Sequence, residues 1–267
     1  MSSKRKFIYL PIVVLVVSVI FYVYRTNRLR DFEQIKNKGV LRVTTNYNSV
    51  DYFMDGDSVR GFQYELIEVL CDSLGVQAEW IIENSLDKNR KDLTKGNVDL
   101  IARNIPVTTA LRQQLAFSHP IIHTKQLLVQ RKAEYNNGIQ PLRNQLLLAK
   151  KTVYVPSNSP SLLRLKNLES EIADTIFIKE MPNYEAEQLI MMVAKGDIDF
   201  AVCDAQVARI NATLLPEIDI QTAISFTQMQ SWAMRPSSTE LQAKVDSFLV
   251  YFLETKAYRD IYRKYYK

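Results

Sequence analysis

The chain holds few of the side chains that supply metal or redox chemistry. Its two cysteines, Cys71 and Cys203, are more than a hundred residues apart, so they form neither a zinc-type cluster nor a C-x-x-C pair. We expect both to be small buried hydrophobic residues. The two histidines, His119 and His123, flank Pro120, where the helical i, i+4 pairing of metal ligands is not expected. The sequence therefore predicts no metal and no cofactor.

Motifs of the common enzyme classes are missing as well. No G-x-S-x-G, H-E-x-x-H, P-loop or G-x-G-x-x-G pattern occurs among the 267 residues. The composition, 47% apolar and 24% charged, is that of an ordinary globular protein of one or two domains. It excludes collagen-like, disordered and disulfide-rich chains, and we do not expect an enzyme.

The net charge of +5 is unevenly distributed along the chain. Residues 1–38 hold eight Lys/Arg and two Asp/Glu, a net of +6, whereas residues 39–267 hold 26 Lys/Arg and 27 Asp/Glu, a net of −1. The basic character therefore belongs to the N-terminal segment and not to the folded part. We expect no nucleic-acid partner, because a binding domain would carry its own basic surface.

An apolar run of 18 residues, Phe7–Tyr24, is flanked by basic residues on both sides. At 1.5 Å per residue this length nearly matches the hydrocarbon core of a bilayer. A cleavable signal peptide would need a small-residue cleavage site, but the run ends in Phe-Tyr-Val-Tyr-Arg, and no cysteine near residue 25 supplies a lipoprotein anchor. The sequence predicts an uncleaved signal anchor at residues 1–24, followed by a polar, helical tether at 25–38.

The remaining sequence alternates short strands with helices, which predicts an α/β fold with mostly parallel sheets. The first unit contains the expected strands Val40–Thr45, Gln77–Ile82 and Val98–Ala102 and the expected helices Gly61–Leu74 and Leu86–Lys95. A second unit then repeats the pattern. Its expected elements are the strands Leu127–Arg131, Thr152–Val155, Thr175–Ile178 and Ile198–Cys203 and the helices Ser161–Leu168 and Tyr184–Ala194. A strand, Ser231–Met234, a long helix, Ser238–Leu253, and a short helix ending in Tyr265–Tyr266 form the last expected block.

The order of several phrases resembles the bacterial family 3 solute-binding domain, a two-lobe periplasmic-binding-protein type II or flytrap fold. The phrases are GVLRVTT at Gly39–Thr45, GFQYELIEVLCDSLGV at Gly61–Val76, GNVDLIA at Gly96–Ala102, TTALRQQLAFSHP at Thr108–Pro120 and GDIDFAVCD at Gly196–Asp204. The resemblance implies lobe 1 at 39–128 plus 224–267 and lobe 2 at 129–223, joined by two crossing strands. It also implies ligand binding by closure of the lobes.

Within this family the chain is similar to the N-terminal regulatory domain of membrane-bound lytic murein transglycosylase F. Asp51-Tyr52, Tyr64–Leu66, Leu128–Arg131 and the surroundings of Trp232 carry this narrower resemblance. Such enzymes use a Glu followed by Ser as the acid catalyst. Glu169-Ser170 fits that pair, but it falls inside lobe 2, so we interpret it as a chance match.

The resemblance assigns roles to individual residues of a site for a small zwitterionic or peptide-like ligand. Asp204 matches the acceptor of the ligand amino group, Ser159 matches the helix N-terminus that receives its carboxylate, and Tyr52 matches the aromatic wall. Asn104 matches a polar position facing the ligand. Each has a structural alternative: helix caps for Asp204 and Ser159, and plain packing for Tyr52.

The arginine that clamps the ligand carboxylate in this family has no direct counterpart. The family pattern, counted from Asp99, places Thr108 and Phe117 as expected, but it puts Leu111 at the arginine position. Arg112 is one residue further on, about 100° around a helix, and is as well explained by a solvated position. Arg103 is a possible substitute cation. A second departure is Asn158, which stands where the family usually has Gly before the capping Ser.

Three functions remain open at this point. The first is a membrane-anchored binding or sensor domain on the periplasmic side of the inner membrane, recognising an amino acid, a peptide or a muropeptide. The second is an amino-acid receptor for an ABC permease. The third is a protein-interaction domain, near a cell-wall enzyme, that has lost ligand binding. We favour the first.

Overall fold

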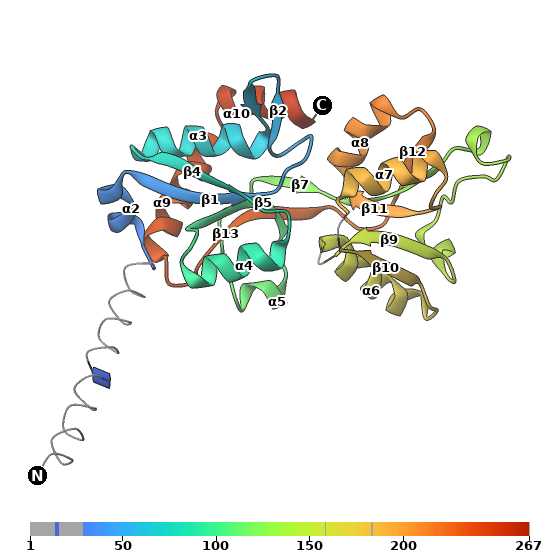
Figure 1. Cartoon of the computed structure of the whole chain (residues 1–267), viewed down its shortest axis with the longest axis horizontal. Helices are drawn as coiled ribbons and strands as arrows, with labels where there is room; N and C mark the ends of the chain where they lie inside the picture. The colour runs from blue at the N-terminus through green and yellow to red at the C-terminus, as the bar shows by residue number, and fades with distance from the viewer. Residues whose placement is uncertain (1–13, 16–28, 158, 183, 267) are drawn as a thin grey trace, which may run out of the picture.

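The structure, a computed structural model, describes residues 14–15, 29–157, 159–182 and 184–266. Figure 1 shows two α/β lobes side by side, with the chain passing between them. This arrangement confirms the predicted α/β class with two lobes. The segment predicted as a membrane anchor, Phe7–Tyr24, lies almost entirely outside the described residues. Within the described ranges, no helix combines the length and the apolar character needed to span a membrane.

Each lobe is built on one main sheet. The strands of lobe 1 are β1 (Val40–Thr45), β4 (Gln77–Ile82), β5 (Leu100–Pro106), β6 (Ala116–Phe117), β7 (Ile122–Thr124) and β13 (Gln228–Met234). The strands of lobe 2 are β8 (Gln126–Arg131), β9 (Thr152–Pro156), β10 (Phe177–Met181), β11 (Ala201–Asp204) and β12 (Ile218–Ala223). A separate hairpin in lobe 1 consists of β2 (Phe53–Asp55) and β3 (Ser58–Arg60).

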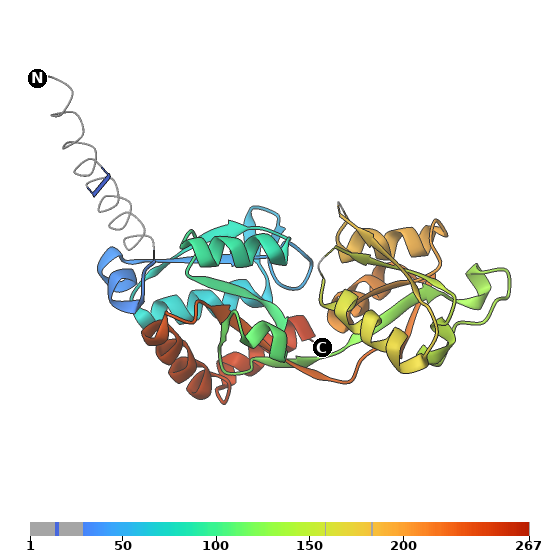
Figure 2. The same ribbon diagram turned by 90° about the horizontal axis from the view of Figure 1, so that it is seen from below.

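Helices cover the sheets of both lobes (Figures 1 and 2). Those of lobe 1 are α2 (Phe32–Lys38), α3 (Phe62–Leu74), α4 (Leu86–Lys95), α5 (Thr109–Arg112), α9 (Thr239–Phe252) and α10 (Lys256–Tyr266). Those of lobe 2 are α6 (Pro160–Ile172), α7 (Ala186–Lys195) and α8 (Ala205–Leu214), together with the short 3-10 turns Ala133–Tyr135 and Gln145–Leu148.

The strand order places the carboxyl ends of parallel strands toward the space between the lobes. In lobe 1, β1 pairs in parallel with β4 and β5, within the order β4-β1-β5-β13-β6. In lobe 2, β9 pairs in parallel with β10 and β11, within the order β10-β9-β11-β8-β12. Ligand sites of open α/β sheets form at such carboxyl ends.

The chain crosses between the lobes twice, between β7 and β8 and between β12 and β13. The first crossing therefore comes near residue 125, three residues before the predicted boundary at 128, because β8 already begins at Gln126 in the sheet of lobe 2. The second crossing follows Ala223, the last residue of β12. Two close crossings of this kind act as a hinge between lobes.

Residues predicted to form a tether belong to lobe 1 from Arg30 onward. Arg30 and Phe32 are buried, and α2 contacts both α9 and β1. Arg30, Arg42 and Arg235 surround the fully buried Asp99, with the Arg42 Nη2 to Asp99 Oδ1 distance at 2.7 Å. Burial alone would raise the pKa of Asp99, but hydrogen bonds from Arg42 and Arg30 hold it below its ordinary value. The chain thus enters lobe 1 through a buried ion cluster.

The core of lobe 1 is centred on Trp232, which is fully buried on β13. Its indole Nε1–H donates to Gln63 Oε1 on α3 at 2.6 Å, so the polar edge of the ring is satisfied. The C-terminal helix α10 packs its tyrosine rings around Phe62 of α3, with the Tyr266 ring centroid at 4.8 Å. The last turn of the chain is therefore fixed beside the sheet end that faces lobe 2.

The predicted elements are largely present, with shifted ends. The strand predicted at Val98–Ala102 runs instead from Leu100 to Pro106, because it continues alongside β13 up to the pair Pro106 and Gln230. Helix α8 and strand β12 were not predicted. Helix α8 follows β11 without a loop, since Asp204 both ends the strand and caps the helix.

Candidate functional site

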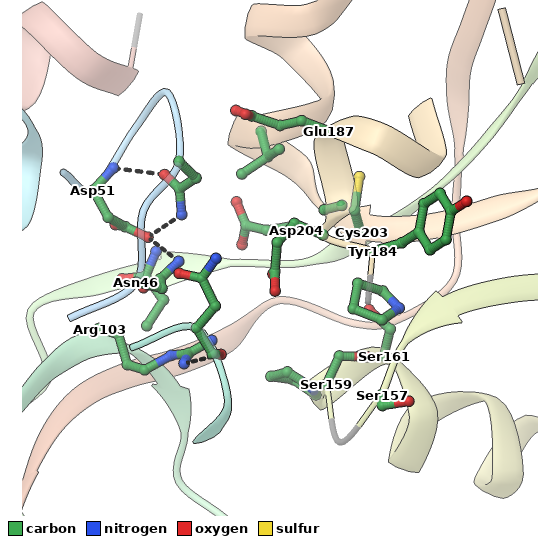
Figure 3. Close-up of a pocket in the computed structure, with 18 of the residues that line it drawn as sticks. Asn46, Asp51, Arg103, Ser157, Ser159, Ser161, Tyr184, Glu187, Cys203 and Asp204 are labelled. Carbon is green, nitrogen blue, oxygen red and sulfur yellow. Dashed lines mark hydrogen bonds between the residues drawn. The ribbon is translucent and has the colours of Figure 1, made fainter. Parts of the chain in front are cut away.

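A cavity of about 350 Å³ lies between the two lobes. In lobe 1 its lining residues come from the segments after β1 and β4 and from the second half of β5. In lobe 2 they come from the ends of β9, β10 and β11 and from the first turns of the helices that follow. Figure 3 shows Asp51 and Arg103 on one side of this cavity, facing Glu187, Asp204 and Ser159 on the other.

The loop after β1 carries a buried carboxyl group. Asp51 is 4% exposed, and its Oδ2 accepts hydrogen bonds from the side-chain amides of Asn48 at 2.8 Å and Asn46 at 3.3 Å. Its other oxygen, Oδ1, is buried without a hydrogen-bond partner among the described residues. Burial raises the pKa of Asp51, while Asn48, Arg103 and the nearby Gln63 partly offset that rise.

Gly61 holds this loop in place through an unusually close approach. The backbone carbonyl of Asp51 accepts from the N–H groups of Gln63 and Tyr64 in the first turn of α3. Gly61 has φ +142°, and a Cβ there would lie 2.2 Å from Asp51 O. Only glycine allows this contact, so the position of the Asp51 carboxyl depends on residue 61.

Arg103 is the only basic residue among the described residues that line the cavity. It lies on β5, and its Nη1 donates to the carbonyl of Asn84 at 2.8 Å, which fixes the guanidinium at the wall of lobe 1. Burial lowers its pKa, and the charges of Asp51, Glu185 and Glu83 act in the opposite direction. The group stays a cation at neutral pH and provides a fork of N–H donors at the cavity.

Asn104, next on β5, also lines the cavity, but its amide is already bonded on both sides. Its Oδ1 accepts from Gln63 Nε2 at 2.9 Å, and its Nδ2 donates to Tyr266 Oη at 3.0 Å. A chain of hydrogen bonds thus runs from Trp232 through Gln63 and Asn104 to Tyr266. Asn104 therefore braces the cavity floor, linking β5 to α3 and α10.

Asp204 lines the opposite wall, where β11 ends. Its Oδ1 accepts from Gln206 N at 2.8 Å, which caps α8, and its Oδ2 accepts from Thr124 Oγ1 at 2.9 Å. Burial raises the pKa of Asp204 to about 6, and the negative charge of Asp51 adds to the rise. Asp204 therefore caps α8 and also lines the cavity.

The first turn of α6 forms the polar wall below Asp204 in Figure 3. Ser159 stands at its N-cap but makes no capping hydrogen bond, and its buried Oγ has no partner among the described residues. Ser161, two residues on, donates to Gln126 Oε1 at 2.5 Å. The N-terminus of this 13-residue helix thus faces the cavity with the unpartnered Ser159 hydroxyl, while Pro160 has no backbone N–H and Leu162 N donates to Ser159 O at 3.1 Å. Asn158 itself lies outside the described residues.

Helix α7 contributes two glutamates that reach toward lobe 1. Glu187 Oε1 accepts from the backbone N–H of Ser49 at 2.8 Å, a direct hydrogen bond between the lobes. Glu185 caps α7 and interacts with the Asn84 side chain and the Arg103 charge. Burial raises the pKa of Glu185, which those two groups partly counter. The lobes therefore touch through the acidic N-terminus of α7.

The other candidate residues lie away from the cavity lining. The Tyr52 ring packs between Tyr64 and Trp80, with centroids at 5.8 and 5.4 Å, as its packing alternative describes. Thr108 caps α5 by accepting from Leu111 N at 3.3 Å. Arg112 is exposed, while Leu111 packs against the core behind β5. Of the two candidate cations, the structure places Arg103 at the cavity.

Several lining residues were missed at the level of sequence, above all Asp51, Glu185 and Glu187. The sequence does contain a signal that points to Asp51. Asn46, Asn48 and Asp51 are short polar residues directly after a buried strand, where side chains meet at a sheet edge. The glutamates stand at the start of a helix, where acidic residues are common for capping alone.

The model of the bacterial extracellular solute-binding proteins, family 3, matches residues 41–267. The chain belongs to this family. Solved structures agree on the fold of a family 3 domain: ArgBP from T. maritima, in a mutant form, superposes with a TM-score of 0.77 at 20% identity, covering 88% of this chain and 98% of that one. An ancestral arginine-binding protein bound to arginine gives 0.75 at 24% identity, covering 86% and 99%.

Curated relatives of this family 3 chain include membrane-bound lytic murein transglycosylase F from several bacteria. The chain is 28% identical to that of Desulfosudis oleivorans over 246 residues, 92% of this chain and 52% of the relative. It is 30% identical to that of Pseudomonas putida over 226 residues, 81% of this chain and 44% of the relative. The chain spans about half the length of these relatives, which confirms the narrower resemblance to their solute-binding domain.

Proposed function

We propose that this family 3 domain binds a small amino-acid-like or peptide-like ligand in the interlobe cavity and signals its presence by lobe closure. The observation that carries the proposal is the distribution of charge around the cavity. Arg103 and the unpartnered Ser159 hydroxyl at the start of α6 supply donors, while Asp204 and Asp51 supply acceptors on facing walls. A zwitterion satisfies both sets at once.

The carboxylate of the ligand binds between Arg103 and the first turn of α6. Arg103 is the sole guanidinium in the described part of the lining and replaces the family arginine, whose position is taken by Leu111. Ser159 Oγ is buried without a partner in the described structure, so a ligand oxygen completes its hydrogen bonding. Because these groups belong to different lobes, one carboxylate draws the lobes together.

The ammonium group of the ligand binds at Asp204. That carboxyl already accepts from Gln206 N and Thr124 Oγ1, which orient it toward the cavity. A buried cation beside it offsets the cost of holding Asp204 ionised away from water. Binding without any chemical step suffices to explain the arrangement, since the lining residues that the structure describes include neither a nucleophile–base pair nor a histidine.

The apolar segment Phe7–Tyr24 anchors the chain in the inner membrane, with the two lobes on the periplasmic side. Its length, the basic flanks and the membrane-bound nature named for the curated relatives support this location. In that setting the domain reports on cell-wall peptides or amino acids to a cell-wall enzyme. A second candidate is a receptor for an ABC permease, which the likeness to free amino-acid-binding proteins favours.

A thermal-shift screen of the full chain in detergent micelles tests the proposal. The compounds are the free amino acids, short peptides and muropeptides. A ligand present at about 100 times its dissociation constant should stabilise the fold by about 2.7 kcal/mol, and Asp204→Ala should abolish the shift. A hit with peptides or muropeptides supports the sensor role, and a hit with a free amino acid supports transport. No shift with any compound contradicts both and leaves a protein-interaction role.

A further inference from the structure

A second hollow, of about 480 Å³, lies in lobe 1 between α4 and the segment that follows α5. Its lining includes Asp87, Arg90, Lys91 and Lys95 of α4, with Gln114 and Leu115 from the segment after α5. Three of these side chains are basic and one is acidic, whereas the described lining of the interlobe cavity has five carboxyl groups and one guanidinium. We call this hollow the α4 groove. It shares no lining residue with the interlobe cavity, so it is a separate place on the molecule.

The α4 groove keeps a net positive charge. Its acidic lining residue, Asp87, already accepts from Arg90 Nη1 at 3.1 Å and therefore offsets only that guanidinium. Lys91 and Lys95 are exposed and stand four residues apart, so their side chains project from the same face of α4. Two ammonium groups on one face favour a ligand that is itself negatively charged.

Arg90 also has a donor that no described residue accepts. Its Nη1 donates to Asp87 and its Nη2 to Gln114 Oε1, and these two bonds hold the guanidinium between the two sides of the groove. Its Nε is buried without a hydrogen-bond partner among the described residues. A buried N–H without an acceptor is costly, and guanidinium groups bind phosphate and carboxylate oxygens well. An anionic oxygen in the groove would satisfy this donor.

The position of the groove indicates where such an anion would come from. Arg235 Nη1 donates to the carbonyl of Leu93 in the last turn of α4 at 3.2 Å, and its Nη2 donates to the carbonyl of Arg30 at 2.6 Å. One guanidinium thus joins the end of α4 to the start of lobe 1, and both lie at the lower edge of this lobe in Figure 1. Arg30 comes six residues after Tyr24, the last residue of the proposed anchor, and six residues span at most about 22 Å. The anchor therefore holds α4 close to the surface of the bilayer.

We propose that the α4 groove binds the phosphate headgroup of an anionic phospholipid and so docks lobe 1 on the membrane surface. The inference rests on the part of the proposed function that places an anchor at Phe7–Tyr24, and it adds a lipid site outside the ligand cavity. Lys91 and Lys95 attract the anionic surface, and Arg90 Nε donates to a phosphate oxygen. Docking holds lobe 1 against the bilayer, so closure of the lobes moves lobe 2.

Fluorescence quenching of the full chain in lipid vesicles tests the inference. A fluorophore is attached to Gln113→Cys, an exposed position at the end of α5, and a nitroxide on a small fraction of the lipid headgroups quenches it. Vesicles of phosphatidylcholine alone are compared with vesicles that also contain phosphatidylglycerol. We expect the anionic lipid to increase quenching at least about twofold. Lys91→Gln with Lys95→Gln should abolish the increase, whereas the matched control, Lys151→Gln with Lys166→Gln at exposed positions of lobe 2, should retain it.

Flotation of the chain with each kind of vesicle, measured alongside, separates this inference from the proposed anchor. Equal quenching in the two lipid compositions, with the chain floating in both, overturns the inference and leaves the anchor standing. An increase that survives Lys91→Gln with Lys95→Gln overturns the role of the α4 groove. A chain that floats with neither kind of vesicle contradicts the proposed anchor and overturns the inference with it, while the thermal-shift screen decides ligand binding separately.

Discussion

At the scale of single residues, Arg103 and Arg112 show how one register position decides a binding role. Arg112 stands one residue from the family arginine position, on the exposed side of a four-residue helix, and does not reach the cavity lining. Arg103 comes from a strand, and Asn84 O fixes its guanidinium at the wall of lobe 1. A strand position is rigid, which favours its use as the clamp.

Arg103→Gln should weaken the affinity for an amino-acid ligand by more than about tenfold, because the variant loses the charged fork that binds the carboxylate. Arg112→Gln is the matched control and should leave the affinity within about twofold. Calorimetric titration of both variants with the same amino acid checks this expectation. Equal losses in the two variants would contradict the assignment of Arg103.

Asp204 predicts a dependence of stability on pH. Burial raises its pKa from 3.8 to about 6, so the folded state binds more protons than the unfolded state between these values and loses stability as the pH rises through them. Asp204→Asn removes this penalty while an amide oxygen can still cap α8. The ligand-free variant should therefore be more stable than the unchanged protein by roughly 3 kcal/mol at pH 8 and equal to it near pH 3. Thermal unfolding at both pH values measures the difference, and a gain that is the same at both would refute this explanation.

A site residue can be predicted from sequence only when its type and position distinguish it from residues of the same type that have other roles. Asp204, Asn104 and Ser159 were anticipated from the family resemblance and Arg103 as a substitute cation next to Asn104, and all four line the cavity. Tyr52 was predicted to line the ligand site in place of its neighbour Asp51, because the family has an aromatic wall at this position. No local pattern separates a buried aspartate from the many aspartates of surface loops. Its burial comes from α3 and Gly61, which only the folded structure brings together.

At the scale of elements, three helix N-termini of lobe 2 meet at the cavity, and their caps differ. Helix α8 is capped by Asp204 and α7 by Glu185, whereas α6 has a serine that makes no capping bond. Acidic caps neutralise the positive end of a helix dipole. Among these three helices α6 alone has no acidic cap, so a ligand carboxylate is favoured at its end, where the unpartnered Ser159 hydroxyl is the donor and Pro160 supplies no backbone N–H.

Gly61→Ala should disturb the loop that carries Asp51. The new Cβ would meet Asp51 O at 2.2 Å at a φ of +142°, so the loop must move, and we expect a loss of more than about 2 kcal/mol of stability together with weaker ligand binding. Gly56→Ala is the control, because its φ of +61° is also positive but a Cβ there has no neighbour within 4 Å. Its cost should stay near 1 kcal/mol with binding unchanged. Thermal unfolding and titration of both variants test this, and similar effects at the two glycines would contradict the close-approach argument.

Asp99 joins the start of the folded chain to the sheet of lobe 1. Replacing it by Asn leaves Arg30, Arg42 and Arg235 without their shared carboxylate, and we expect a loss of about 3–5 kcal/mol of stability. Asp199→Asn breaks an ion pair with Arg131 in which the aspartate side chain is 71% exposed, so it should cost less than about 1 kcal/mol. Thermal midpoints of the two variants give the comparison. A small effect at Asp99 would mean that the cluster does not hold lobe 1 together.

Helices and strands were predicted with the right bounds where local sequence patterns mark their ends. The prediction failed where pairing with a distant strand determines how far a strand extends. Strands β1 and β4 and helix α4 have the predicted bounds because alternation, helical spacing and a terminal glycine mark them in the sequence. Strand β5 extends four residues further than predicted since β13, more than a hundred residues later, pairs with it. The hairpin of β2 and β3 was missed because each strand has only three residues.

At the scale of the whole molecule, the folded chain begins in lobe 1, and the described residues of lobe 2 join lobe 1 through the two crossings, the cavity contacts and a hydrogen bond from the Gln206 side-chain amide on α8 to the Tyr265 carbonyl on α10. Arg30 is buried against Asp99, and Asp31 accepts from the first backbone N–H groups of α9 at Glu240 and Leu241. Lobe 1 is therefore fixed relative to its entry point, while lobe 2 is the part that can rotate. Ligand binding would be read out as movement of lobe 2 above a stationary lobe 1.

The most direct test of the account is a distance between the lobes with and without ligand. Spin labels at Lys91→Cys on α4 and Lys166→Cys on α6 report this distance by pulsed electron resonance, since both positions are exposed. The native thiols are buried, and burial raises the pKa of Cys71 to about 12, so they should not take up the label. We expect a saturating ligand from the thermal-shift screen to shorten and narrow the distance distribution. A distribution that a saturating ligand leaves unchanged would contradict ligand capture between the lobes.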